Sequence, residues 1–281
     1  MPDNVCNVDK RFLYNDYREI KIMQKLEHTF VIMAYKESPY LEECIKSVVT
    51  QSLRSDIILS TSTPNEHIKL LSKKYNLPLF VNNGEGDIIG NWNFAFSLPK
   101  TSFVTLCHQD DIYGQDYLKE ISKYFSKDVL ILHTAWYCLK NNIKTQNLCI
   151  KAHKILNFIA KTVPSSARLR RFILSFGMSI KTPSICYNKA VLPAPLWGRK
   201  YKMVFDWEAI SKIAERRGKF IYINKPLFLY RISDQAASYA FTNNGIRMNE
   251  DFSMFCYFWP KYVASFIHYF YKKSYNIYIE K

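Results

Sequence analysis

Segments typical of β-strands alternate with segments typical of amphipathic helices from residue 29 onward, and this alternation limits the folds that the chain can adopt. Strands are predicted at 29–35, 56–62, 77–82, 101–108 and 129–139, with helices at 38–53, 65–75, 91–98 and 116–125 between them. Two parallel strands that follow each other in a chain need a crossover connection, which is usually a helix. The alternation therefore predicts an α/β fold in which helices flank a single mixed, mostly parallel sheet.

The second half of the chain contains a strongly basic block. No Asp or Glu occurs between Asp128 and Asp206, and the 13 Lys and Arg residues of that interval account for most of the net charge of +15. Its centre, residues 151–176, interleaves basic with aliphatic and aromatic residues and predicts a helical insertion broken at Pro164. Segregated positive charge indicates an anionic partner such as a nucleic acid, a membrane surface or a phosphate-bearing substrate.

The remaining sequence adds a helix, further strands and an aromatic tail. A helix is predicted at 206–218, and a hairpin or a pair of strands at 219–232. The seven cysteines are far apart and include no C-x-x-C, which predicts reduced core thiols in a cytoplasmic protein. The longest stretch without Asp, Glu, Lys or Arg is twelve residues. A membrane-spanning helix needs roughly 18 apolar residues, so none is predicted.

The stretch "VTLCHQDDIYG", residues 104–114, places two adjacent carboxylates directly after a predicted buried strand. Asp110 and Asp111 repel each other there, so they need water, a hydrogen-bond donor or a cation. One interpretation is a solvated turn, because Asp is a common turn residue. The other is a site for a hard metal ion, since open α/β sheets bind ligands at the carboxyl ends of their strands.

Several short motifs occur in an order that is more specific than any one of them. Ala34-Tyr35-x-Glu37 ends the first predicted strand, and "LEECIKSVVTQS" forms the helix that follows it. A Ser/Thr cluster then ends the second strand, and "WNFAF", "HQDD" and "FDWE" come after it in that order. This order resembles family 2 glycosyltransferases, which have the GT-A fold and transfer a sugar from a nucleotide diphosphate with inversion. The likeness covers roughly residues 29 to 135 and 178 to 240.

The resemblance implies a metal site at the end of the fourth strand. "HQDD" looks like the family's D-x-D-D motif, in which the carboxylates hold Mn²⁺ or Mg²⁺ against the donor diphosphate. Asp110 is the implied direct ligand, Asp111 supports it, and His108 stands in place of the first aspartate.

The same resemblance implies a catalytic base and a donor site. Asp206 of "FDWE" falls on the family's catalytic carboxylate, with Phe205 in place of a glutamate, and Glu208 is the fallback. The alternative for Asp206 is a helix cap, for which aspartate is a natural residue. The implied donor site comprises Ala34, Tyr35, Glu37, Thr61 and Asn93 beside Asp110 and Asp111, with Arg231 contacting a phosphate or the acceptor.

The resulting hypothesis divides the chain into five parts. These are an N-terminal extension (1–28), a Rossmann-like nucleotide-sugar half (29–135), a basic, partly helical segment (136–205), an acceptor and catalytic-base half (206–240) and an aromatic-rich C-terminal segment (241–281). The hypothesis expects a nucleotide-diphosphate sugar as donor, such as a hexosyl donor, and a lipid-linked or glycan acceptor in the synthesis of capsule, lipopolysaccharide O-antigen or a similar surface polysaccharide.

The expected location follows from the basic block, and two other functions compete with the hypothesis. A basic amphipathic stretch can lie on anionic lipid, so we expect a cytoplasmic protein held peripherally at the inner face of the cell membrane. A metal-dependent phosphohydrolase could use the same Asp pair but needs several more clustered ligands. A nucleic-acid-binding module would use the basic charge and the aromatic residues, but the charge is confined to one block and no nucleic-acid motif is visible, so nucleic acid is not an expected partner.

Overall fold

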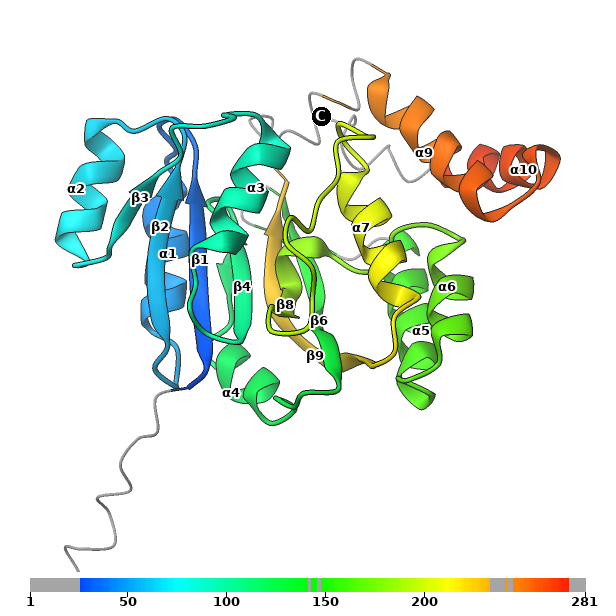
Figure 1. Ribbon diagram of the computed structural model, residues 1–281, viewed down its shortest axis with the longest axis horizontal. Coiled ribbons are helices and arrows are strands. Elements are labelled where there is room, and N and C mark those ends of the chain that lie inside the picture. Colours follow the sequence, from blue (N-terminus) through cyan, green and yellow to red (C-terminus); the bar gives the residue numbers. More distant parts are fainter. Residues whose placement is uncertain (1–25, 141–142, 146–147, 233–240, 242–244, 273–281) are drawn as a thin grey trace, which may run out of the picture.

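The computed structural model describes residues 26–140, 143–145, 148–232, 241 and 245–272, which build an α/β fold around one sheet (Figure 1). The sheet has nine strands in the order β3-β2-β1-β4-β8-β6-β9-β5, with β7 paired to β6. The strands are β1 (His28–Ala34), β2 (Asp56–Thr61), β3 (Leu79–Val81), β4 (Phe103–His108), β5 (Ile112–Tyr113), β6 (Val129–Lys140), β7 (Ile143–Thr145), β8 (Ile185–Asn188) and β9 (Lys219–Arg231). The predicted α/β class and the mixed, largely parallel sheet are confirmed.

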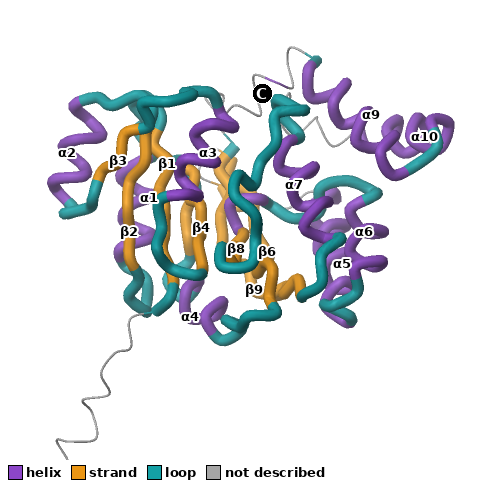
Figure 2. The backbone as a smooth tube through the Cα atoms, in the orientation of Figure 1, coloured by secondary structure: helices purple, strands orange, loops and turns teal. Residues whose placement is uncertain are grey.

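One half of the sheet is parallel and aligns the strand ends that the sequence singled out. β1 pairs in parallel with β2 and β4, and β2 pairs in parallel with β3. The register sets Ala34 opposite Thr61 and Met33 opposite His108. The connections that follow these strands therefore gather at one end of the sheet (Figure 2). This is the edge at which open α/β sheets bind their ligands.

The other half of the sheet is mixed. β8 lies antiparallel between β4 and β6, β9 runs parallel to β6, and β5 runs antiparallel to β9. The hairpin considered for 219–232 is wrong, because β9 is one continuous strand. Pro226 lies within β9 opposite Ala135, where the β6–β9 register shifts. A proline lacks the N–H that a regular ladder needs, so an irregularity is where a strand tolerates it.

Helices cover both faces of the sheet. The helices of the described residues are α1 (Leu41–Val49), α2 (Glu66–Lys74), α3 (Ile88–Ser97), α4 (Tyr117–Ser122), α5 (Leu148–Thr162), α6 (Ala167–Leu174), α7 (Phe205–Ala214), α9 (Ile246–Phe258) and α10 (Lys261–Tyr271), with a 3-10 turn η1 (Thr182–Ser184). Of these, α9 and α10 pack on each other and on Trp207 of α7. Alternate residues of β1 serve two separate cores, because successive strand side chains point to opposite faces. Val31 packs with the tryptophan-rich cluster around Trp197 and Trp207, whereas Phe30 and Ile32 pack with the cluster on the other face.

The basic block between Asp128 and Asp206 contains the strands β6, β7 and β8, the helices α5 and α6, and η1. α5 and α6 flank Pro164, as predicted, while β8 belongs to the middle of the sheet. α5 exposes Ile155, Phe158 and Ile159, and Val163 directly after the helix is exposed as well, with relative exposures between 45% and 63%. Apolar side chains of a helix normally face a core, so this exposed face is unusual.

Arg170 departs from its expected place on the basic surface of that block. Its side chain is buried, and its guanidinium donates hydrogen bonds to the carbonyl oxygens of Pro164, Ala214, Arg216 and Gly218. It therefore joins α6 to the end of α7 and is not available to an external anion.

Two further predictions concern the cysteines, which were expected to be reduced core thiols, and the helices, none of which was expected to span a membrane. Cys44, Cys107, Cys138 and Cys186 are buried free thiols, as expected, but Cys256 is exposed. Cys6 and the Cys149 side chain lie outside the described part of the chain. Among the described residues, no helix is long and apolar enough to cross a membrane.

Candidate active site

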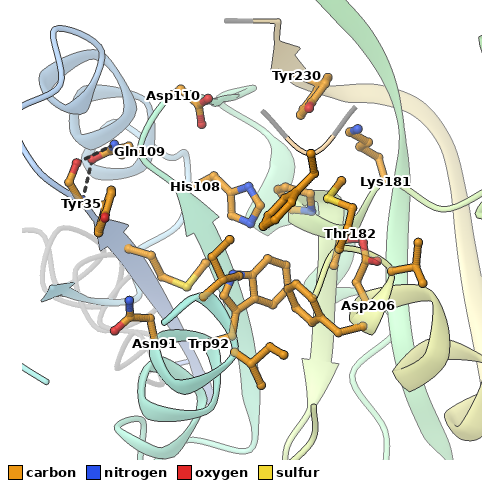
Figure 3. A pocket seen from close by; sticks show the side chains of 18 of the residues that line it. Tyr35, Asn91, Trp92, His108, Gln109, Asp110, Lys181, Thr182, Asp206 and Tyr230 are labelled. Carbon is orange, nitrogen blue, oxygen red and sulfur yellow. Dashed lines mark hydrogen bonds between the residues drawn. The ribbon is translucent and has the colours of Figure 1, made fainter. Parts of the chain in front are cut away.

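A cavity of about 810 Å³ opens at the carboxyl ends of β1, β2 and β4. Its wall on one side is built by these strand ends and the start of α3. The opposite wall is built by residues 178–183, the start of α7, and residues of α9 and α10. Of the residues predicted to form the site, Ala34, Tyr35, Thr61, His108, Asp110 and Asp206 line this cavity. Figure 3 shows Tyr35 and Asp206 on opposite sides of it.

Gln109, to which the sequence assigned no role, joins the ends of β1 and β4 through two hydrogen bonds. The backbone N–H of Tyr35 donates to Gln109 Oε1 at 2.8 Å, and Gln109 Nε2 donates to the Tyr35 carbonyl oxygen at 3.0 Å (Figure 3). Tyr35 as a residue remains about half exposed, at 48%, and the Lys36 ammonium lies 5.3 Å from its ring centroid. An aromatic face held open beside the cavity can stack on a planar ring.

Two predicted donor residues lie outside the cavity lining. Glu37 is exposed on the loop after β1. The Asn93 amide accepts the backbone N–H groups of Leu196 and Trp197 and donates to the Trp197 carbonyl oxygen, so it fixes that loop. Asn91, two residues earlier on α3, lines the cavity instead.

The acidic turn after β4 brings three possible ligands together. The ligand atoms of His108, Asp110 and Asp111 lie within 4.8 Å of one another. Burial raises the pKa of both carboxyl groups, and the negative charge of Asp110 raises that of Asp111 further. Burial lowers the pKa of His108 to about 3, so its imidazole is neutral near pH 7 and able to coordinate a metal.

Asp111 provides a test of whether this turn fits a cation. Its side chain is completely buried, and its Oδ1 accepts the backbone N–H of Arg231 at 3.0 Å. Its buried Oδ2 receives no hydrogen bond from the described residues and lies 3.9 Å from His108 Nδ1. A buried, unpaired carboxylate oxygen is costly unless a cation or proton offsets its charge. The donor set therefore fits a hard divalent ion.

Arg231 holds the back of the acidic turn and does not line the cavity. Its Nε donates to the Asp110 carbonyl oxygen at 3.0 Å, and its guanidinium pairs with Glu43 and stacks 4.4 Å from the Tyr40 ring centroid. These contacts orient the turn from the side of α1, whereas the sequence predicted a contact with phosphate or acceptor.

Asp206 lies in the first turn of α7 and faces the cavity. Its Oδ2 accepts the Thr182 hydroxyl at 2.6 Å, and its Oδ1 accepts the backbone N–H of Trp207 at 2.7 Å. Burial raises the pKa of Asp206, and the two hydrogen bonds oppose that rise because they favour the charged form. Glu208 lies outside the lining and pairs with Lys212 at 2.8 Å.

Lys181 is a site residue that the sequence analysis counted only as part of the basic block. Its Nζ lies 3.3 Å from the centroid of the Tyr230 ring and 5.7 Å from that of Trp136. All three residues line the cavity. The pairing of β6 with β9 and the packing of η1 against β6 bring these residues together, so no local sequence signal marks the group.

Comparison with known proteins identifies similar chains. The family model described as "Glycosyl transferase family 2" matches residues 29–188, which is more than half of the chain. No curated protein matches the sequence. Staphylococcus aureus TarS 1–349 in complex with UDP-GlcNAc has a similar fold, with a TM-score of 0.59 at 12% identity over 89% of this chain and 73% of TarS 1–349.

A second solved structure has the same degree of similarity. The mannosyltransferase PcManGT from Pyrobaculum calidifontis, in complex with GDP-Man and Mn²⁺, also aligns with a TM-score of 0.59 and 12% identity. The alignment covers 83% of this chain and 64% of PcManGT. At such low identity these two likenesses establish the fold, which is GT-A, as expected.

Proposed function

The chain belongs to glycosyltransferase family 2, and we propose that it is a metal-dependent, inverting enzyme that moves a sugar from a nucleotide diphosphate to a lipid-linked or glycan acceptor. One observation supports this most directly: a single cavity has the acidic turn at one wall and Asp206 at another. Inverting transfer needs stabilisation of the departing diphosphate and, on the opposite side of the sugar, a base for the acceptor hydroxyl. The two acidic centres suit these two tasks.

In this proposal residues 29–135 bind the nucleotide sugar. The nucleoside lies against the ends of β1 and β2, where Ala34, Tyr35 and Thr61 line the cavity. The Tyr35 ring offers a stacking face, and Asn91 offers an amide to the donor. Asn93 acts indirectly, by fixing the loop at Leu196 and Trp197.

Asp110, Asp111 and His108 would hold Mn²⁺ or Mg²⁺. When bound, such an ion supplies Lewis-acid stabilisation of the diphosphate charge. The chain's own contribution is to keep both carboxylates aimed at one point. Arg231 does so through its bonds to the Asp111 side chain and the Asp110 carbonyl oxygen.

Asp206 is the proposed base, in the 206–240 half that receives the acceptor. It takes the proton of the attacking hydroxyl, while the Thr182 hydroxyl and the Trp207 N–H fix the direction of its carboxylate. Its raised pKa makes it a stronger base than an exposed aspartate. Glu208 is a poor substitute, because it pairs with Lys212 outside the cavity.

The acceptor and the cellular location follow from α5 in this proposal. Its exposed apolar side chains lie beside the exposed Lys151, Lys154 and Lys161, an arrangement suited to the interface of an anionic membrane. We propose that the protein sits peripherally at the inner face of the cell membrane, receives a lipid-linked acceptor there and contributes to a surface polysaccharide such as capsule or O-antigen.

The two competing functions lack comparable support. A phosphohydrolase of this type needs more clustered ligands than the three that the described residues bring together. The basic block offers a nucleic acid fewer charges than the sequence suggested, since Arg170 is buried.

The decisive test is transfer by Asp206→Asn. A thermal-shift panel of nucleotide sugars with Mn²⁺ first identifies the donor, and release of nucleoside diphosphate in the presence of membrane lipid extract then reports transfer. Asp206→Asn should keep donor binding and lose at least about 100-fold in transfer, the usual size of a general-base contribution. Glu208→Gln is the matched control and should stay near wild type. If both variants transfer normally, Asp206 is not the base.

A further inference from the structure

Lys181 is a cation placed between the two acidic centres of the cavity. It directly precedes η1, and Figure 3 shows it beside Tyr230, Thr182 and Asp206, across His108 from Tyr35. Its positive charge lowers the pKa of Asp110, Asp111 and Asp206 alike. The ammonium group therefore favours the ionised carboxylates at both ends of the site.

Aromatic rings, rather than a carboxylate, hold this ammonium group. Nζ lies over Tyr230, 3.3 Å from its centroid, with Trp136 at 5.7 Å. Within the described part of the chain, no carboxylate oxygen comes within the 4.0 Å of an ion pair. A cation on an aromatic face is held in place without being neutralised. Its N–H donors thus remain available to an anion in the cavity.

The anion best suited to this position is a phosphate of the donor. We propose that Lys181 binds the phosphate next to the transferred sugar and remains on it as the nucleoside diphosphate departs. The inference rests on the proposed function, because it takes the donor to lie along the acidic turn. A lysine interacts with phosphate as a point charge and does not need the planar geometry of an arginine.

This contact fits the electron balance of the transfer. The bond between the anomeric carbon and the phosphate oxygen breaks, and its electron pair stays on that oxygen. The acceptor oxygen forms the new bond to carbon and gives its proton to Asp206. Negative charge therefore grows on the phosphate oxygen, to which the Lys181 ammonium group donates a hydrogen bond. Such a contact strengthens as the bond breaks, which is the requirement for stabilising a transition state.

The test compares nucleotides that differ by one phosphate. Calorimetry would measure binding of UDP, GDP, CDP and ADP and of the matching monophosphates, both in EDTA and in Mn²⁺. Lys181→Met removes the charge but keeps an apolar chain, Lys181→Gln is a second neutral variant, and Lys181→Arg keeps the charge. Lys144→Met is the matched control, because Lys144 is exposed on β7 and lies outside the cavity lining.

We expect Lys181→Met to bind the preferred diphosphate about 10- to 100-fold more weakly, the usual effect of losing one charge-assisted hydrogen bond. Monophosphate affinity should change little, and the loss should appear in EDTA as well as in Mn²⁺. Lys181→Arg and Lys144→Met should stay close to wild type. If Lys181→Met does not fold, as judged by circular dichroism, Lys181→Gln takes its place.

The outcomes separate this inference from the proposed function. If the wild type binds no nucleotide, the proposed function fails. If the wild type binds and both neutral variants keep the full preference for diphosphate, the inference fails while the proposed function stands. A rise in the KM of the acceptor with unchanged diphosphate affinity would overturn the inference too, since it would assign Lys181 to the acceptor.

Discussion

The Thr182 hydroxyl donates a 2.6 Å hydrogen bond to Oδ2 of Asp206, across 24 residues of sequence. This bond joins η1 to the first turn of α7 and favours the ionised carboxylate, against the effect of burial. Because Lys181 precedes Thr182 directly, one short segment sets both the direction of the proposed base and the position of the neighbouring cation.

Thr182→Val should move the acid limb of the pH–rate profile to higher pH. The base must be ionised to act, so the rate falls as pH drops through the pKa of Asp206. Removing the Thr182 hydrogen bond raises that pKa. The profile of kcat/KM against pH measures the shift, and Thr182→Ser, which keeps the hydroxyl, should restore the wild-type profile. An unshifted limb in Thr182→Val would show that another group is titrating.

Asp110→Asn should abolish the gain in donor affinity that Mn²⁺ gives. Asp110 lines the cavity, whereas Asp111 is buried and already bonded to the Arg231 N–H, so Asp111→Asn should reduce the gain less. Calorimetric titration of the donor with and without Mn²⁺ measures both effects, and melting curves check the folding of each variant. An undiminished metal effect in Asp110→Asn would refute the assignment.

The sequence predicted the acidic parts of this site and missed much of what surrounds them. Asp110 was singled out as a carboxylate at a strand end, and Asp206 because the family resemblance places it on a catalytic carboxylate; both roles stay predictions. Lys181 was one of 13 basic residues in its block, and Gln109 was an unremarked polar residue. Their roles depend on which distant strands meet, and a local pattern does not specify that.

Strand pairing also explains what was mistaken in the fold. The sequence of residues 219–232 predicted a hairpin or a pair of strands, whereas the structure has one strand that includes Pro226, a residue without the N–H of a regular ladder. The shifted β6–β9 register accommodates it, and β9 continues to Arg231 behind the acidic turn. The helices and the parallel strands of residues 29–135 were predictable, since their hydrophobic periods are local.

The exposed face of α5 should bind anionic vesicles at low salt. Phe158→Ser and Ile155→Ser should each weaken vesicle binding, because less apolar surface then enters the lipid interface. Sedimentation with vesicles of phosphatidylglycerol and phosphatidylcholine measures this. Leu70→Ser is the matched control, as Leu70 is 64% exposed on α2. Equal sedimentation of the control and both α5 variants would exclude this face as the docking site.

His28 should make the protein less stable in acid. It is fully buried between the hydroxyls of Ser55 and Thr105, and burial lowers its pKa to about 3 from an ordinary value near 6.5. Below pH 6.5 the unfolded chain therefore binds a proton that the folded chain does not. The contribution of neutral His28 to the free energy of unfolding is complete above pH 6.5. It falls by about 1.4 kcal/mol per pH unit as the pH decreases towards 3.

The measurement compares wild type with His28→Gln by urea unfolding between pH 7 and pH 5. The difference in the free energy of unfolding between the wild type and the variant should shrink as pH falls, because glutamine does not titrate in this range. Other titrating groups are common to both chains and cancel in the difference. Two stability curves that stay parallel would contradict the prediction.

β4 is shared by the parallel and the mixed halves of the sheet, since it pairs with β1 on one side and β8 on the other. Many enzymes that bind two substrates hold them between domains that move relative to each other about a hinge. A continuous ladder of hydrogen bonds through β4 leaves no such hinge between the halves. We therefore expect the distance between Asp110 and Asp206 to change little during the proposed transfer, so that a donor and an acceptor that fit this distance react without a domain movement.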